Sequence, residues 1–235
     1  MTVLRSLLFV ALFYIWSVFV AVGLLPVLLG PRRWAERSLS LWSLGIIWLL
    51  RVCCRVKTEL RGREHMPRGA ALVAAKHQCM FDIFGQFHVL PTGCFVMKKE
   101  LLLIPVFNLW VKKLQIIVVD REGHSAALKK LVRDAQARFA DGREVVIFPE
   151  GTRTDPGSPG DYKPGIAALY REINVPVHPM ATNSGVHWPA HGFIRRPGTI
   201  VFEYLEPIPP GLKRAEFMRI LQERIETASL RLLTE

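Results

Sequence analysis

The chain has 235 residues, of which 50% are hydrophobic and 22% charged, and it carries a formal net charge of +11. This length suits one domain with a short appendage, and the apolar fraction excludes a disordered chain. A chain of this size buries enough surface to fold without disulfides or a structural metal. The basic excess indicates a polyanionic partner, such as nucleic acid, an anionic membrane surface or a phosphorylated substrate.

The basic excess is concentrated in the first third of the chain. Residues 1–69 hold ten Lys or Arg residues and three Asp or Glu residues. Because these charges flank apolar segments, they favour a membrane surface over nucleic acid. Signatures of zinc fingers, basic zippers and RNA-binding domains are absent from the sequence. The four cysteines form no CxxC pair, so we expect reduced thiols rather than disulfides or a zinc site.

Two uncharged segments open the chain. Residues 7–29 form a run of 23 residues, long enough to span a bilayer core and longer than the apolar core of a cleaved signal peptide. Residues 38–50 are short for a span and predict a helix in the membrane interface. The flanking basic residues favour the cytoplasmic face for the rest of the chain. Whether residues 1–56 span the membrane or enter one leaflet stays open, and two helices of a soluble core are the alternative.

From residue 58 onwards, short apolar runs alternate with helical patterns. This alternation predicts an α/β fold with a sheet covered on both faces by helices. We therefore divide the chain into membrane-anchoring helices over residues 1–57 and an α/β domain over residues 58–235. The expected strands cover 70–75, 93–97, 116–119, 144–148, 175–180 and 199–204, and the expected helices cover 81–90, 127–139, 166–173 and 214–233.

A histidine and an aspartate follow the first expected strand. His77 lies at the carboxyl end of that strand, and Asp82 comes five residues later. On one straight helix the two side chains would not face each other, but they meet if His77 is in the loop and Asp82 in the first helical turn. A carboxylate bonded to one imidazole nitrogen leaves the other free to accept a proton. The pair therefore predicts a general base, with a structural His–Asp pair as the alternative.

Cationic residues follow three other strands. Arg153 can bind a phosphate with two parallel hydrogen bonds, and Arg121 and Lys98 also stand at strand ends. Gly151 permits close backbone approach, and Glu150 can orient its neighbours. Each cation alone could be a solvated surface charge. Together they indicate a phosphate-bearing substrate at the carboxyl edge of the sheet.

Taken together, these motifs resemble the glycerolipid acyltransferase family, especially the bacterial 1-acyl-sn-glycerol-3-phosphate (lysophosphatidic acid) acyltransferases. The resemblance covers roughly residues 58–210. Four blocks appear in the family's order: HxxxxD at His77 and Asp82, an arginine block at 116–121, EGTR at 150–153 and a proline block at 175–180.

The resemblance implies acyl transfer from acyl-CoA or acyl carrier protein to the 2-hydroxyl of lysophosphatidate, giving phosphatidic acid. It implies a mixed sheet flanked by helices and an enzyme at the cytoplasmic face of the cell membrane, among membrane lipids. His77 would be the base and Asp82 would hold it, with no metal and no cofactor. The acceptor phosphate would be held by Arg121, Arg153 and Lys98, and the supporting residues would be Glu150, Gly151 and Thr152. A backbone N–H near Gly151 would stabilise the oxyanion.

The sequence departs from the family pattern at three positions. Lys76 and Cys79 stand where the family often has Asn and Ser, and Gln115 stands where a glycine is common. We expect these departures not to touch a catalytic group. A thiol nucleophile at Cys79 is disfavoured because residues i and i+2 do not normally face one another.

Other functions remain open at this point. The acceptor could be another lysolipid, such as a lyso-ornithine lipid. A protein of another class could bind anionic membranes without catalysis. Residues 183–185 and Trp188 could touch the substrate, whereas we interpret the remaining histidines as structural or surface residues: His65, His88, His124, His178, His187 and His191.

Overall fold

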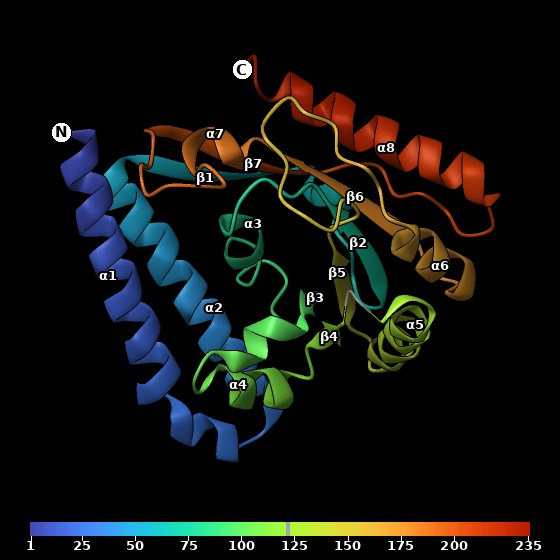
Figure 1. Ribbon diagram of the computed structural model, residues 1–235, viewed down its shortest axis with the longest axis horizontal. Coiled ribbons are helices and arrows are strands. Elements are labelled where there is room, and N and C mark those ends of the chain that lie inside the picture. The colour runs from blue at the N-terminus through green and yellow to red at the C-terminus, as the bar shows by residue number, and fades with distance from the viewer. Residues whose placement is uncertain (121–122) are drawn as a thin grey trace.

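The computed structural model describes residues 1–120 and 123–235, which form a mixed sheet of seven strands with helices on both faces (Figure 1). The predicted fold class is therefore confirmed. The strands lie in the order β1-β7-β6-β2-β5-β3-β4. Their bounds are β1 Val56–Arg61, β2 Ala71–Ala75, β3 Cys94–Lys98, β4 Ile117–Val119, β5 Glu144–Ile147, β6 Val177–Thr182 and β7 Gly198–Tyr204.

Strand direction brings the sequence motifs to one edge of the sheet. β6 and β7 pair antiparallel, and every other neighbouring pair is parallel. The five strands β2 to β6 therefore point the same way, and their carboxyl ends share one edge. Open α/β sheets bind ligands outside the carboxyl ends of their strands. His77 and the EGTR loop follow strands that end at this edge, and Lys98 is the last residue of another such strand, β3.

The helices form two layers that pack on opposite faces of the sheet. α5, α6 and α8 cover one face, and α1, α2 and α3 cover the other (Figure 1). Successive side chains of a strand point to opposite faces of the sheet, so alternate residues pack against the two helical layers. Leu72 and Val145 pack in the cluster with α5, α6 and α8, whereas Val73 and Val146 pack in the cluster with α1, α2 and α3. The helix bounds are α1 Thr2–Gly23, α2 Arg32–Leu49, α3 Phe81–Phe84, α4 Phe107–Leu114, α5 His124–Ala140, α6 Pro164–Glu172, α7 Ser184–His187 and α8 Arg214–Arg231.

Two N-terminal helices, Thr2–Gly23 and Arg32–Cys54, are long and apolar enough to cross a membrane by length and composition. The second comprises α2 and the π-helical turn η2, Leu50–Cys54. Only 22% and 39% of their apolar windows are buried within the protein. Such exposed apolar surface is typical of a membrane or partner contact. Their outward-facing apolar side chains include Leu4, Leu8, Ile15, Val18, Phe19, Leu41, Trp48 and Val52.

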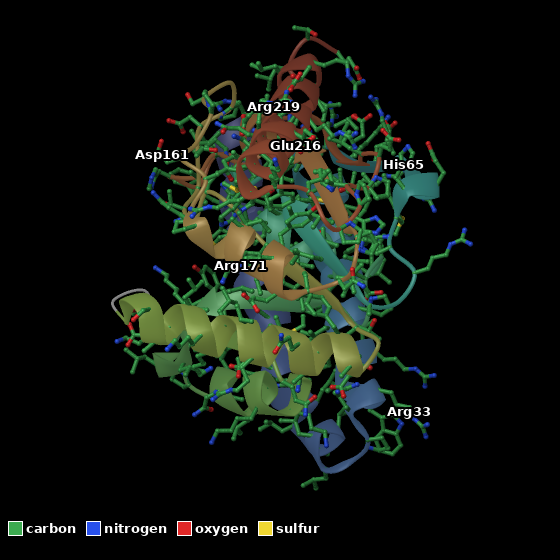
Figure 2. All side chains as sticks on the ribbon, turned by 90° about the vertical axis from the view of Figure 1, so that its right-hand side faces the viewer. Arg33, His65, Asp161, Arg171, Glu216 and Arg219 are labelled. Carbon is green, nitrogen blue, oxygen red and sulfur yellow. The ribbon has the colours of Figure 1, made fainter. Side chains whose placement is uncertain are left out.

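The N-terminal helices also contact the rest of the chain at both ends of α1. The Arg195 N–H donates to Ser6 Oγ (2.8 Å), and the Trp110 indole N–H donates to the Ala21 carbonyl (3.0 Å). Phe9 belongs to the same hydrophobic cluster as the sheet residue Val73. A continuous core thus crosses residue 57, and the division of the chain there stays a prediction. At the far end of this helical pair, Arg33 points outward where α2 begins (Figure 2).

Several elements differ from the sequence predictions. The helix expected over 81–90 ends at Phe84, and the carbonyls of Phe84 and Phe87 bond hydroxyls of α2. Ser43 Oγ donates to the Phe84 carbonyl (2.6 Å), and Ser40 Oγ donates to the Phe87 carbonyl (2.9 Å). The apolar run 7–29 is divided into α1 and a 3-10 helix, η1 Leu25–Leu29, with Pro26 in its first turn. The sequence predicted neither β1 nor α4.

Candidate active site

The structure brings His77 and Asp82 together. His77 lies in the loop after β2, Asp82 lies in the first turn of α3, and Nδ1 of the imidazole is 3.0 Å from Asp82 Oδ2. The imidazole stacks on the Phe148 ring with centroids 4.0 Å apart, and its side chain keeps 14% of its surface exposed. Since Nδ1 is bonded to the carboxylate, a proton from a substrate would be accepted at Nε2.

Asp82 is fully buried, and donors surround its carboxylate. The backbone N–H groups of Gln78 (2.6 Å) and Cys79 (2.7 Å) donate to Oδ2. The Ser184 hydroxyl and the Cys79 thiol donate to Oδ1. A buried carboxylate needs such partners, and together they fix its orientation. The expectation that Cys79 touches no proposed catalytic group is therefore wrong, because both its N–H and its thiol bond the Asp82 carboxylate.

The start of α7 packs against the loop that carries His77. Ser184 is buried and bonds Asp82, and the Gly185 N–H donates to the Gln78 side-chain oxygen (2.9 Å). Trp188 is also buried and stacks on Phe81, with ring centroids 5.7 Å apart. The structure places Ser184 and Gly185 against the loop of His77 and Trp188 against α3, and their predicted contact with the substrate stays a prediction.

Glu150 holds the backbone of the histidine. Its Oε2 accepts a hydrogen bond from the His77 backbone N–H (2.9 Å), and its Oε1 accepts bonds from Thr154 Oγ1 (2.9 Å) and Lys76 Nζ (2.6 Å). Burial raises the pKa of Glu150, and the adjacent Lys76 ammonium opposes that shift. Lys76 therefore contacts Glu150, which was predicted as a supporting residue and not as one of the two catalytic groups. Thr154 makes the contact with Glu150, and Thr152 is exposed.

Gly151 forms the turn between Glu150 and the arginine of the motif. Its φ of 68° lies in the left-handed region, where a residue with a side chain is strained. An added Cβ would also lie 3.2 Å from the Lys163 side chain. The Gly151 N–H donates to the Phe148 carbonyl (3.0 Å), so it is engaged within the turn. The Gly151 N–H is therefore already used, and an oxyanion donor near Gly151 stays a prediction.

Two of the three cations expected to bind phosphate, Arg153 and Lys98, lie on the same edge, and within the described part of the chain neither bonds His77 or Asp82. Arg153 is exposed, and its Nη1 donates to the Ala190 carbonyl (2.8 Å). Lys98 is exposed at the end of β3, opposite Val119 of β4. Arg121 lies outside the described residues. The structure thus places two of the three cations near strand ends and leaves the phosphate contact as a prediction.

The environment of Cys79 argues against a thiol nucleophile. The side chain is fully buried, and burial raises the pKa of its thiol well above the usual value. The nearby Asp82 charge raises it further. Because the thiolate is the reactive form, a buried thiol with a raised pKa is a poor nucleophile.

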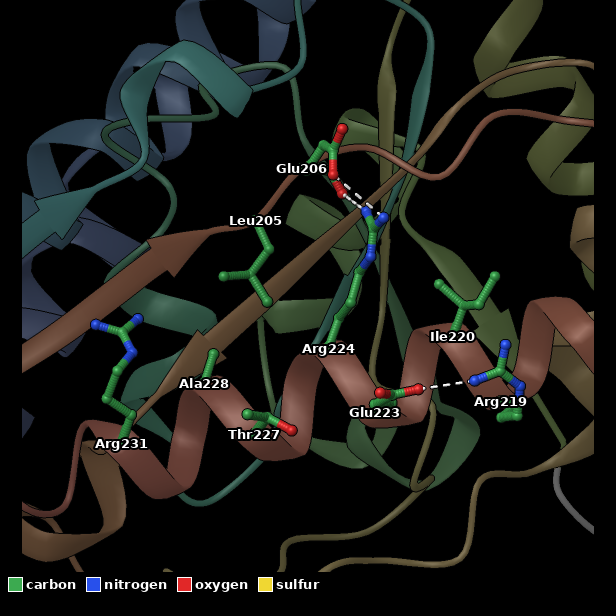
Figure 3. Close-up of a pocket in the computed structure, with 9 residues that line it drawn as sticks. All are labelled: Leu205, Glu206, Arg219, Ile220, Glu223, Arg224, Thr227, Ala228 and Arg231. Carbon is green, nitrogen blue, oxygen red and sulfur yellow. Dashed lines mark hydrogen bonds and ion pairs between the residues drawn. The ribbon is translucent and has the colours of Figure 1, made fainter.

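A groove of about 510 Å³ lies elsewhere, between α8 and the segment that follows β7 (Figure 3). Leu205, Ile220 and Ala228 give it apolar walls, and the Arg219–Glu223 ion pair (2.9 Å) stands at its rim. None of its nine lining residues was predicted from the sequence as a site residue. His65, expected at the surface, lies on the short helix η3 (Arg63–His65) at the edge of the molecule (Figure 2).

Comparison with known proteins assigns the chain to a family. The acyltransferase family model matches residues 57–183. A 1-acyl-sn-glycerol-3-phosphate acyltransferase from Pseudomonas aeruginosa is 36% identical over 206 residues, which cover 85% of this chain and 77% of the relative. The human 1-acyl-sn-glycerol-3-phosphate acyltransferase alpha is 31% identical over 173 residues, covering 72% of this chain and 60% of the relative.

A solved structure supports the fold over the full length. The crystal structure of the acyltransferase PlsC from Thermotoga maritima superposes with a TM-score of 0.83 at 22% identity, covering 100% of this chain and 99% of that chain. At this identity the similarity establishes the fold alone. Because the family model covers more than half of the chain and a relative is 36% identical across most of it, the resemblance seen in the sequence is confirmed: the chain belongs to the acyltransferase family.

Proposed function

We propose that this protein transfers an acyl chain from acyl-CoA or acyl carrier protein to the 2-hydroxyl of 1-acyl-glycerol-3-phosphate, producing phosphatidic acid. The observation that carries the proposal is the bond between His77 Nδ1 and the buried Asp82. Relatives named for this activity support the choice of acceptor. The exposed cation Arg153, at the same sheet edge as His77, supports an acceptor that carries a phosphate.

In the proposed reaction, His77 acts as a general base. Nε2 removes the proton of the acceptor hydroxyl as its oxygen attacks the thioester carbonyl, so the C–O bond forms and the C–S bond then breaks. The leaving thiolate takes the proton from the imidazolium. Asp82 holds the ring in position and stabilises the imidazolium while it is positive. The acceptor is itself the nucleophile, so the scheme includes no acyl-enzyme, no metal and no cofactor beyond the acyl donor.

Binding of the acceptor would involve Arg153, Lys98 and Arg121 on its phosphate. Its acyl chain would remain in the lipid layer that contacts α1 and α2, since both helices expose apolar side chains. We place the protein at the cytoplasmic face of the cell membrane because basic residues flank these helices. A membrane-attached enzyme would reach an acceptor and a product that are both lipids.

The test is acyl transfer from acyl-CoA to lysophosphatidate by the purified protein in detergent, with wild type and His77→Ala side by side. We expect phosphatidate from the wild type and a rate lower by about 10²-fold or more from His77→Ala, the usual scale for a general base. Equal rates from both proteins would refute the role of His77. If the folded wild type forms no phosphatidate from either acyl-CoA or acyl carrier protein, the proposed reaction is wrong.

A further inference from the structure

A buried lysine lies next to the proposed base and contacts two carboxylates. The side chain of Lys76 is 1% exposed, and its Nζ lies 2.6 Å from Glu150 Oε1 and 2.8 Å from Glu226 Oε2. Nζ also donates to the Ser158 carbonyl (3.1 Å). Lysine is rarely buried so completely unless its charge is paired. These contacts use the three donors of the ammonium.

The two carboxylates come from distant parts of the chain. Glu150 follows β5 in the EGTR loop, whereas Glu226 lies on α8 near the C-terminus. Tyr162, in the loop between them, donates its hydroxyl to Glu226 Oε1 (3.1 Å). Lys76 therefore joins the C-terminal helix to the loop that carries the proposed base.

A continuous set of bonds leads from this lysine to His77. Glu150 accepts the Lys76 ammonium on one oxygen and the His77 backbone N–H on the other. Thr154 contacts both residues: its N–H donates to the His77 carbonyl (2.8 Å), and its hydroxyl donates to Glu150 (2.9 Å). Both backbone polar groups of His77 are thus held through the part of the chain that Lys76 fixes.

From this arrangement we infer that Lys76 is a positioning residue for the acyl transfer: its ammonium, anchored by Glu226 of α8, compensates the buried charge of Glu150 and thereby keeps Glu150 in place against the backbone of His77. The inference rests on the proposed role of His77 as the base. Lys76 itself touches no reacting atom.

The charges around Lys76 predict how activity should depend on pH when the ammonium is removed. The groups facing Glu150 are the Lys76 ammonium from the end of β2, the Glu226 carboxylate from α8 and the Tyr162 hydroxyl from the following loop. Burial already raises the pKa of Glu150, and Lys76 is the largest opposing influence. Without the ammonium, the charge of Glu226 faces Glu150 uncompensated, and the pKa of Glu150 rises further.

The rise in the pKa of Glu150 determines at which end of the pH range the variant loses activity. When the pKa of a buried carboxyl is raised, the folded structure accommodates its neutral form and is destabilised as the pH rises through that pKa. In a variant without the ammonium, the arrangement of Glu150 and His77 is therefore lost as Glu150 ionises. A variant without the ammonium should therefore lose activity towards alkaline pH. Removing the charge of Glu226 as well should relieve part of the loss.

The experiment measures kcat and KM for lysophosphatidate in detergent from about pH 6 to about pH 9. The variants are Lys76→Met, Lys76→Gln, Glu226→Gln and the double variant Lys76→Met/Glu226→Gln, together with His77→Ala. Glu223→Gln is the matched control, because Glu223 is an exposed glutamate on the same helix that pairs only at the surface with Arg219 (Figure 3).

We expect Lys76→Met and Lys76→Gln to lower kcat by roughly 10- to 100-fold at the alkaline end, with a smaller loss at the acidic end and KM within about 3-fold of wild type. The double variant should recover at least about 3-fold of the loss, whereas Glu223→Gln should match wild type. Lys76→Gln keeps a hydrogen-bond donor, so it tests the charge even where Lys76→Met does not fold.

Two results would overturn the inference: a wild-type pH profile in Lys76→Gln, or a loss that is equal at every pH and unrelieved by Glu226→Gln. Failure of the proposed function is recognised separately. An active His77→Ala would refute the base and this inference together, whereas an inactive His77→Ala beside a Lys76→Gln variant with a wild-type profile would refute only the role of Lys76.

Discussion

Replacing Asp82 by asparagine isolates the charge that the proposed mechanism requires. Three donors converge on Oδ2, namely the His77 imidazole and the N–H groups of Gln78 and Cys79. The amide oxygen of an asparagine must take this place, because its NH₂ group would oppose all three donors. The NH₂ group then faces Ser184, whose hydroxyl can rotate to accept a bond. We therefore expect Asp82→Asn to fold.

The magnitude of the effect follows from what the carboxylate does during transfer. Hydrogen bonds to a charged group contribute about 1.5–3 kcal/mol, against about 0.5–1.5 kcal/mol for neutral partners. The Asp82 bond to His77 strengthens as the imidazolium forms, so the loss falls mainly on the transition state. Removing the charge of the aspartate in serine protease triads lowers kcat by about 10⁴-fold. We expect a loss of about 10²- to 10⁴-fold in kcat, with KM within about 3-fold because Asp82 is fully buried.

The assay is steady-state acyl transfer to lysophosphatidate, with thermal unfolding measured on the same samples. Ser184→Ala is the matched control, since it removes one donor to the same carboxylate and keeps the charge. It should lower kcat by only about 5-fold, because the Ser184 bond is present in the resting enzyme as well as in the transition state and the charge that stabilises the imidazolium remains. The reasoning is refuted if folded Asp82→Asn keeps kcat within about 3-fold of wild type, or if Ser184→Ala loses as much as Asp82→Asn.

Three further predictions address the acceptor, the thiol and the backbone. Arg153→Ala should raise KM for lysophosphatidate about 10-fold or more and change KM for an uncharged lysolipid little, because a charged hydrogen bond to phosphate is lost; equal effects on both acceptors would contradict a phosphate contact. Cys79→Ala should keep kcat within about 10-fold, and a maleimide should not inhibit the native enzyme, because the thiol is fully buried and its pKa is raised. Loss of all activity in folded Cys79→Ala would restore the thiol as a nucleophile. Gln115→Gly should stabilise the protein by up to about 1 kcal/mol in thermal unfolding. Gln115 directly follows α4 and has a φ of 55°, a conformation in which glycine is unstrained. The substitution also removes the bond between Gln115 and Arg32 (2.6 Å), which opposes the gain. A lower melting temperature would mean that this bond outweighs the strain.

Local sequence patterns predicted most of the sheet and the central pair. The predicted strands that end before His77 and Glu150 are present within one or two residues, since buried strands depend on short apolar runs. His77 and Asp82 meet as their spacing predicted, because five residues of loop and helical turn fix their geometry locally. The helix predicted over residues 81–90 was too long, since α3 ends at Phe84 and the carbonyls of Phe84 and Phe87 contact serines of α2, a tertiary contact that periodicity does not reveal.

The sequence by itself determined the family, the α/β fold and the local contact between histidine and aspartate, because each depends on residues close together in the chain. Only the tertiary structure decided which distant side chains support that contact. Ser184 reaches Asp82 across 102 residues, and Glu226 reaches Lys76 across 150. No periodicity links such positions, since burial brings them together only after the sheet and both helical layers have packed. The departures from the family pattern at Lys76 and Cys79 therefore looked neutral in the sequence, although in the folded protein both side chains bond the carboxylates around His77.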